Sequence, residues 1–250
     1  EPGATVRLVT FPRCWANVFK DGEKKAGEGE VLDASTAPLV LRSHFGDMQF
    51  LHAMASRDKE SAATVRERII IWAEFTWRVA LGEFPLSTRV RDVPVSGIID
   101  YFGSKGWSIQ DLFALGNPHV RKPDNMSELA FGSLLHMVED SFAGGHVERA
   151  MPDGQGKCVG TSREFPMPGQ IVEFHSYGQQ DSKRHGDDDA RSAFSAHWSS
   201  ARPNVVDVGR ALNDYFVRRA PWSEVKPHIA CIFTLDKEVR PASAGEKYAR

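Results

Sequence analysis

Residues 135–146 have the sequence LHMVEDSFAGGH, which sets a histidine, a carboxylate and a second histidine at short, fixed offsets. His136 and Asp140 are four residues apart, so on a helix their side chains lie on one face, one turn apart. The glycine pair at 144–145 then ends that helix and lets His146 fold back toward the same carboxylate. Histidine nitrogens combined with a carboxylate oxygen suit zinc. The stretch therefore predicts a helix that ends at a metal site; the alternative interpretation is a helix end with a capping histidine.

The composition indicates a globular chain with no strong charge bias. At 250 residues with a net charge of −2, one domain can bury a substantial core, and no basic surface of the kind that non-specific nucleic-acid binders use is expected. We therefore expect no specific nucleic-acid partner. The sequence has no run of about twenty apolar residues, so we expect no transmembrane segment. Residues 1–3 lack the basic and apolar regions of a signal peptide.

The pattern along the chain predicts three parts. Residues 1–42 alternate apolar and polar side chains around 6–11 and are then rich in Gly, Lys and Glu, which favours an extended arm or short strands. Residues 43–239 are dominated by helical spacing and form the predicted single domain, which is interrupted by a long irregular loop at 151–180. Residues 240–250 are expected to be a frayed tail. The predicted fold class is all-α.

Helical spacing is clearest at residues 61–81, where apolar side chains surround the helix and indicate a central position. A first helical segment is expected from about residue 43. The further predicted helices are 98–115, a motif helix after Pro123, 190–200, 205–219 and 221–235. The three cysteines, Cys14, Cys158 and Cys231, permit at most one disulfide with one thiol left over.

Two further clusters extend the candidate metal site. His185 and Asp189 repeat the four-residue offset, although an acidic run there also favours the positive N-terminus of the helix that follows. Upstream, His44, Asp47 and His52 lie within nine largely apolar residues. Charges in apolar surroundings need partners, and the partner is either a metal or, alternatively, a buried Asp–His pair.

The order His136-x3-Asp140-x5-His146 followed by His185-x3-Asp189 resembles the zinc-dependent phospholipase C superfamily, which also contains single-strand-specific zinc nucleases. The resemblance implies a helical bundle that holds two or three zinc ions, with Asp140 bridging two of them. The implied ligands are His136, Asp47 and His52 for one ion and His146, His185 and Asp189 for another, and His44 can take the place of Asp47 or His52.

The segment Asp140-Ser141-Phe142-x3-His146-x2-Arg149 resembles the branch of bacterial secreted phosphatidylcholine-type enzymes. This implies a phospholipase C that releases the phosphorylated head group from glycerophospholipids at a membrane surface, outside the producing cell. Asp47 is expected to ligate a metal or to act as general base toward water. Arg149 is expected to clamp a phosphate oxygen, with a plain surface arginine as the alternative.

The sequence is also compatible with two other functions, a zinc-dependent single-strand nuclease and a non-enzymatic helical module with a structural metal. His119 and His175 are spare candidates for a third ion. Better-known members of the superfamily use an N-terminal tryptophan there, whereas the first tryptophan of this chain is Trp15.

Overall fold

The structure is a computed structural model and describes residues 12–37, 39–102, 106–114 and 123–250, with side chains described from residue 19 onward. Helices account for 51% of the structure, and strands together with isolated bridges account for 9%. The mostly helical class is therefore confirmed. The chain is not purely all-α, because β1 (Val147–Arg149) and β2 (Ile171–Phe174) pair into an antiparallel sheet.

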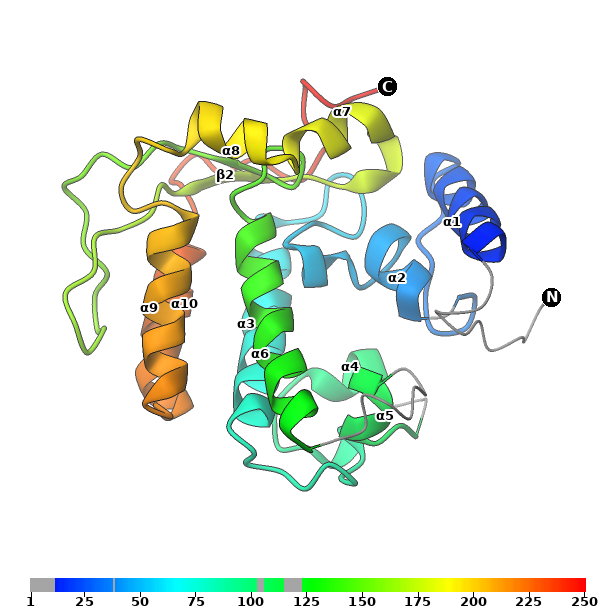
Figure 1. Cartoon of the computed structure of the whole chain (residues 1–250). Coiled ribbons are helices and arrows are strands. Elements are labelled where there is room, and N and C mark those ends of the chain that lie inside the picture. Colours follow the sequence, from blue (N-terminus) through cyan, green and yellow to red (C-terminus); the bar gives the residue numbers. More distant parts are fainter. Residues whose placement is uncertain (1–11, 38, 103–105, 115–122) are drawn as a thin grey trace.

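Most of the molecule is built from helices of unequal length, joined by turns and single-turn 3-10 helices (Figure 1). The α-helices are α1 (Pro12–Gly27), α2 (Leu39–Phe45), α3 (Ala62–Ala80), α4 (Ile98–Phe102), α5 (Ile109–Ala114), α6 (Pro123–Asp140), α7 (Ser182–Asp188), α8 (Arg191–His197), α9 (Val205–Val217) and α10 (Trp222–Ile232). The 3-10 helices are η1 (Gln49–His52), η2 (Val90–Asp92) and η5 (Tyr177–Gln179).

The centre of the fold is the pair α3 and α6, which run side by side in Figure 1. Ser127, near the start of α6, donates to the carbonyl oxygen of Ala80 at the end of α3, and the Trp72 indole donates to Ser133 further along. The two helices are therefore antiparallel. The predicted helices at 61–81 and after Pro123 are both confirmed, and this pairing carries the end of α6 to the same level as the start of α3.

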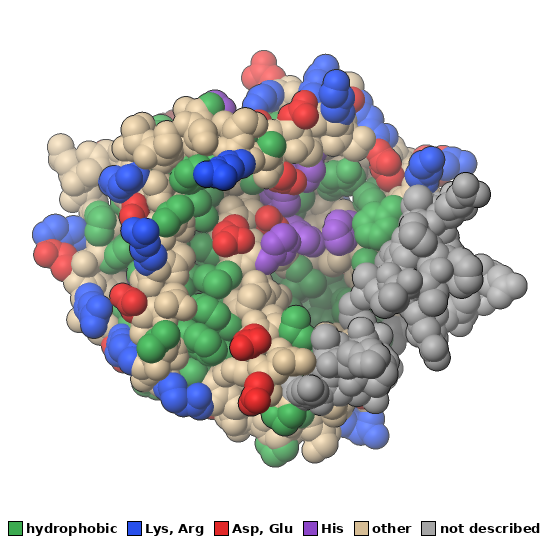
Figure 2. All heavy atoms as spheres, viewed as in Figure 1, with side chains coloured by type: hydrophobic (Ala, Val, Ile, Leu, Met, Phe, Trp, Pro, Cys, Tyr) green, Lys and Arg blue, Asp and Glu red, His purple; other side chains and the backbone are tan. Residues whose placement is uncertain are grey.

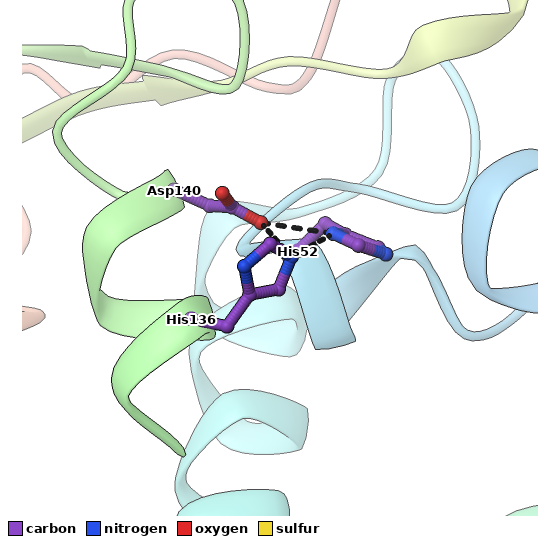
Figure 3. Close-up of side chains that lie close together, drawn as sticks. All are labelled: His52, His136 and Asp140. Carbon is purple, nitrogen blue, oxygen red and sulfur yellow. Dashed lines mark hydrogen bonds and ion pairs between the residues drawn. The ribbon is translucent and has the colours of Figure 1, made fainter. Parts of the chain in front are cut away.

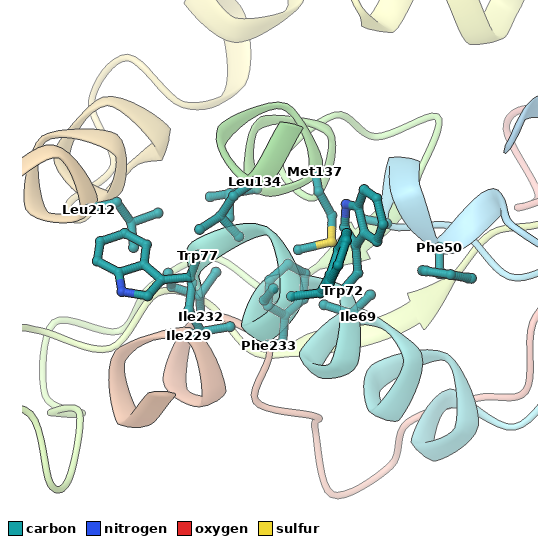
Figure 4. Close-up of a cluster of buried hydrophobic side chains, with 14 of the residues drawn as sticks. Phe50, Ile69, Trp72, Trp77, Leu134, Met137, Leu212, Ile229, Ile232 and Phe233 are labelled. Atoms are coloured by element: carbon teal, nitrogen blue, oxygen red, sulfur yellow. The ribbon is translucent and has the colours of Figure 1, made fainter. Parts of the chain in front are cut away.

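The side chains of α3 explain its central position. Ile69, Trp72, Phe75 and Trp77 point in different directions around the helix, and each is at most 3% exposed. Figure 4 shows Trp72 beside Met137 of α6 and Trp77 near the side chains of α9 and α10. Burial of such a side chain contributes about 1.5–3 kcal/mol. None of the described helices is long and apolar enough to cross a membrane.

Three predicted helices in the second half of the chain are confirmed with shorter bounds. They are α8, α9 and α10, which were expected at 190–200, 205–219 and 221–235. Asn204 caps α9 through a capping box with Asp207, and Pro227 lies inside α10. The Trp77 indole donates to the Ala220 carbonyl oxygen between α9 and α10, which fixes this pair against α3.

The N-terminal prediction is wrong for residues 12–27, which form α1 instead of an extended arm. Phe19, Gly22 and Ala26 have the three- and four-residue spacing of a helix and turn inward, and Pro12 occupies the first helical position, where its missing N–H costs no bond. The alternating residues 6–11, which suggested a strand, lie outside the described residues.

Residues 39–52 do not form the long helix expected from about residue 43. The α2 helix ends at Phe45 and η1 follows after a turn. Ala53 then adopts a left-handed conformation with φ 54° and ends η1. The predicted helix at 98–115 is likewise divided, into α4 and α5, with residues 103–105 outside the described part.

The loop predicted at 151–180 is irregular until β2 begins at residue 171. In the register, Val147 pairs with Phe174, and the sheet brings the residues after α6 beside those before α7. The disulfide Cys158–Cys231 ties the loop to α10, with a Cα–Cα distance of 5.5 Å. The side chain of Cys14 is not among those described.

The C-terminal tail is not frayed, which corrects the prediction for 240–250. Ala242 and Tyr248 are 3% and 5% exposed. The Ser176 N–H donates to the Ser243 carbonyl oxygen, and the Asp181 N–H donates to that of Tyr248. The tail is ordered because its backbone completes hydrogen bonds for the segment that leads into α7.

Candidate metal centre

A first group of ligand atoms forms where η1 meets the last turn of α6. The Nδ1 of His52 lies 2.8 Å from Oδ2 of Asp140, and the Nε2 of His136 lies 3.2 Å from the same oxygen. The two ring nitrogens are 3.1 Å apart. Figure 3 shows the two imidazoles and the carboxylate converging on one point. The helical spacing of His136 and Asp140 places both on one face of α6, as predicted.

These separations suit a single zinc ion. In a tetrahedral site with bonds of about 2.0–2.2 Å, the ligand atoms lie roughly 3.3 Å apart. Asp140 and His52 are 13% and 20% exposed at their side chains, so they form the inner part of the group, whereas His136 is 54% exposed. The group therefore has an open side at His136.

A second group lies on the other side of Asp140. The Nε2 of His146 is 3.3 Å from Oδ1 of Asp189, and the Nε2 of His185 is 3.6 Å from Oδ2 of the same carboxylate. His185 lies in α7 and Asp189 is its C-cap, so the predicted four-residue offset again places both on one side. Gly145 allows this close approach, since a Cβ there would lie 2.9 Å from Nδ1 of His185.

Hydrogen bonds fix which nitrogen of each imidazole faces the group. Nδ1 of His146 donates to the carbonyl oxygen of His52 at 2.8 Å, and Nδ1 of His185 is 2.8 Å from Oε1 of Gln180. Gln180 is fully buried, and its amide donates to the carbonyl oxygens of Gly145 and Ala244, which fixes its orientation. Both imidazoles are thus left with Nε2 toward Asp189. Sequence patterns gave no signal for Gln180.

The Nε2 of His146 is poorly satisfied by the protein alone. Its side chain is 6% exposed, and the Asp189 oxygen 3.3 Å away is not in good hydrogen-bond geometry with this buried nitrogen. A buried polar atom normally has a partner. A cation held between His146, His185 and Asp189 would supply one.

The pKa values of the ligand residues favour neutral imidazoles at two positions. Burial, and then the nearby His52, lowers the pKa of His44 to about 4. Burial, and then His146, likewise lowers the pKa of His185 to about 4. Burial opposes charge on His146 as well, but contacts with Asp189 and Asp140 outweigh it and raise the pKa of His146. Neutral imidazoles have the free lone pair that a metal ligand needs.

Asp140 lies between the two groups. Its Oδ2 contacts His52 and His136 directly and is 3.9 Å from Nδ1 of His146. That nitrogen is the one that donates to the His52 carbonyl, so His146 faces the second group with its other nitrogen. Asp140 therefore belongs to the first group and borders the second, and its role as a bridge stays a prediction.

His44 is close to the first group. Nδ1 donates to the Val40 carbonyl oxygen at 2.9 Å within α2, and the ring centroid lies 4.6 Å from that of His52. The Nε2 of His44 is therefore the nitrogen left for another partner. Of the three upstream candidates His44, Asp47 and His52, the structure therefore brings the two histidines together at the first group.

Asp47 is not part of either ligand group, contrary to the prediction that it ligates a metal or acts as general base. Its two carboxylate oxygens accept from Nε and Nη2 of Arg42 at 2.8 and 2.9 Å. Arg42 is 1% exposed, so it depends on this carboxylate to balance its charge. The bend between α2 and η1 turns Asp47 toward Arg42 while His52 turns toward α6.

Arg149 does not clamp a phosphate in this arrangement, and neither is it the surface arginine of the alternative. It is 8% exposed and donates to the carbonyl oxygens of Ser141, Gly169 and Ile232. Burial lowers the pKa of Arg149 to about 9. The guanidinium joins the turn after α6 to the long loop and to α10, which is a structural role.

The structure also brings together a third group of possible ligand atoms, from Glu148, Glu173 and His175, which the sequence does not predict as a set. Arg240 donates to both carboxylates, so a cation of the protein already pairs with them. His175, a spare candidate for a third ion, belongs to this group. His119 lies outside the described residues.

A large cleft opens beside the first two groups. Its volume is about 1390 Å³, and His136, Asp140 and Asp189 line it. Figure 2 shows histidine side chains gathered in a hollow of this face, with hydrophobic side chains beside them. The larger apolar side chains of the lining include Phe142, Met151, Phe194, Trp198, Val205 and Val206. A substrate in this cleft would reach both ligand groups and an apolar wall.

No protein family, no curated protein and no solved structure matches this chain.

Proposed function

We propose that this protein is a zinc-dependent hydrolase of phosphodiester bonds, related to the zinc-dependent phospholipase C superfamily. One observation carries the proposal: two groups of two histidines and one aspartate lie next to each other at one cleft. A structural zinc site is closed by four protein ligands, whereas a catalytic site keeps an open position. Three ligands in each group and an exposed His136 fit a catalytic site.

The residues present fit two ions. His52, His136 and Asp140 would hold one ion, with His44 nearby as a further nitrogen, and the second would lie between His146, His185 and Asp189. Paired zinc ions supply an activated water and neutralise charge on the attacking and leaving oxygens of a phosphodiester. The protein holds the imidazoles in the required tautomer through the His52 and Gln180 oxygens.

The cleft supports a phospholipid as substrate. Its apolar wall continues to Met151 and Val206, which are 56% and 45% exposed and line the cleft. Exposed large apolar side chains at the edge of a site favour contact with a lipid surface. Arginine and lysine side chains also line the cleft, but Glu139, Glu148 and Asp188 lie among them. These acids would repel the phosphates of a polynucleotide. A glycerophospholipid head group is the proposed substrate.

The disulfide Cys158–Cys231 supports a location outside the cytosol. Disulfides persist in oxidising compartments, such as the periplasm or the extracellular medium. We therefore propose that the protein acts after export or delivery from the producing cell.

The direct test measures metal content and turnover on the same preparation. Two zinc ions per chain, release of phosphorylated head group from phosphatidylcholine or phosphatidylglycerol vesicles, and loss of this release on chelation are expected. Digestion of single-stranded DNA without release from vesicles would identify a nuclease instead. One tightly held ion with no turnover on either substrate would contradict the enzyme and support a structural metal.

A further inference from the structure

A second, smaller pocket lies between the loop after Cys158, α9 and α10. Its volume is about 320 Å³. It shares no lining residue with the cleft at the candidate metal centre. Its walls combine aromatic side chains with arginines, and its innermost polar group is His228.

His228 is buried without a hydrogen-bond partner. It is 1% exposed, and neither of its ring nitrogens bonds to a described residue. The rings of Phe165 and Tyr215 cover it, with centroids 4.7 and 5.4 Å away. The imidazole therefore offers one N–H donor to whatever occupies the pocket, since a neutral imidazole protonates one nitrogen.

The charges around the pocket leave one arginine over. Among the described residues, each acidic side chain of the lining has its own cation: Glu164 has Lys157, Asp207 has Arg202, and Asp214 has Arg163. Arg218 pairs with Glu224. Arg210 lines the pocket and forms no ion pair with any described residue. Arg210 is therefore the one arginine of the lining without a described acidic partner, in a lining that holds three arginines and three acids.

The wall beside His228 is covalently fixed. Cys231 lies one helical turn after His228 in α10, and its disulfide partner Cys158 begins the loop that carries Phe165. Tyr215 comes from α9, where its hydroxyl is 3.2 Å from Ser162 in the same loop. The pocket is therefore bounded by three segments that are joined to one another.

We propose that this pocket binds a small oxyanion, a carboxylate or a phosphate, which accepts a hydrogen bond from His228 and pairs with Arg210. A guanidinium and a neutral N–H donor are the groups that recognise such oxygens. The site is independent of the metal centre, so it does not rest on the proposed hydrolase activity.

The test uses the full chain with its disulfide intact and follows the ring-nitrogen resonances of its histidines by NMR. The spectrum of His228→Phe assigns the His228 signals. Sodium phosphate and sodium acetate are titrated separately at constant ionic strength, which distinguishes a phosphate from a carboxylate ligand. We expect a saturable shift of the His228 signals with at least one of the two anions.

In Arg210→Gln the apparent affinity should fall about tenfold, because a charge-assisted bond is lost. Arg91→Gln, which removes an exposed arginine outside both pockets, should leave the affinity unchanged.

Two results would overturn the proposal. One is the absence of any saturable shift at His228 with either anion up to about 10 mM, a concentration that would detect even weak millimolar binding. The other is equal affinity in Arg210→Gln and Arg91→Gln. Because the signals belong to His228, binding of phosphate at the candidate metal centre does not produce the expected result.

Discussion

The Nδ1 of His146 donates to the carbonyl oxygen of His52 at 2.8 Å, and this bond connects the two ligand groups. His52 contributes its side chain to the first group and its backbone to the orientation of the second. The bond leaves Nε2 of His146 toward Asp189, 3.3 Å from Oδ1. Backbone contacts of this kind set the tautomer of metal-binding histidines. The two groups are therefore coupled, and a change at one is expected to reach the other.

Replacement of Asp140 by Asn is the most direct test of this coupling. Asn keeps the shape of the side chain but removes the negative charge that lies beside His52 and His136. If Asp140 bridges two ions, bound zinc should fall from two ions per chain to one or none. Hydrolysis should fall by about 100-fold or more, because loss of even an outer partner costs 10- to 100-fold. Metal analysis and vesicle hydrolysis on one preparation measure both quantities.

Asp124→Asn is the matched control, since Asp124 is an exposed acid in the first turn of the same helix. It should retain both ions and full activity. Retention of two ions and full activity by Asp140→Asn as well would show that the carboxylate bridges nothing.

Gln180 is expected to act as a positioning residue for His185. Its Oε1 is 2.8 Å from Nδ1 of His185. Gln180→Met keeps the length of the side chain but removes this acceptor, so the ring can rotate or take the other tautomer. Zinc affinity should fall about 10- to 100-fold, and a competition titration with a chelator measures it. Gln179→Met is the control, because Gln179 is exposed and its side chain bonds only to the Gly27 carbonyl oxygen among the described residues. A loss of stability with zinc affinity unchanged would assign Gln180 a structural role alone.

The predicted ligand residues that the structure brings together share one property. His136 with Asp140 and His185 with Asp189 are each four apart at one helix end, and helical spacing alone brings the members of such a pair together. Asp47 lies among histidines in the sequence, yet its partner is Arg42 because of a bend that no local pattern indicates. Gln180 is placed by contacts with Gly145 and Ala244, which are distant along the chain.

The contrast between local helical spacing and contacts between distant residues also explains which predictions about the fold are wrong. The helices α3, α6, α9 and α10 have apolar spacing that predicts them directly. The tail after residue 240 has few apolar side chains and no period, and its order comes from backbone bonds to residues 60 and 176. Such bonds depend on the finished fold, so composition alone predicted fraying.

The disulfide is expected to stabilise the chain substantially. It closes a loop between residues 73 apart, and closure of long loops contributes about 2–4 kcal/mol. Replacing Cys158 and Cys231 together by serine should lower the free energy of unfolding by this amount in guanidinium titrations. Reduced wild-type protein should match the double variant. A thiol assay of the denatured chain should find one free thiol before reduction and three afterwards, since the sequence has three cysteines. Three free thiols without reductant would contradict the bond.

His228 should make stability depend on pH in a defined window. Burial lowers the pKa of His228 from 6.5 to about 4. Between these values the unfolded chain binds a proton that the folded chain does not, so the free energy of unfolding falls as pH drops from about 6.5 to about 4. The loss is at most roughly 3 kcal/mol, at 1.36 kcal/mol per unit of pKa.

His228→Phe keeps an aromatic ring and cannot titrate, so its stability should decline less over this window. Guanidinium titrations of both proteins, made metal-free so that acid release of ions adds nothing, measure the difference. Parallel curves for the two proteins would show that His228 titrates alike in the folded and unfolded chains.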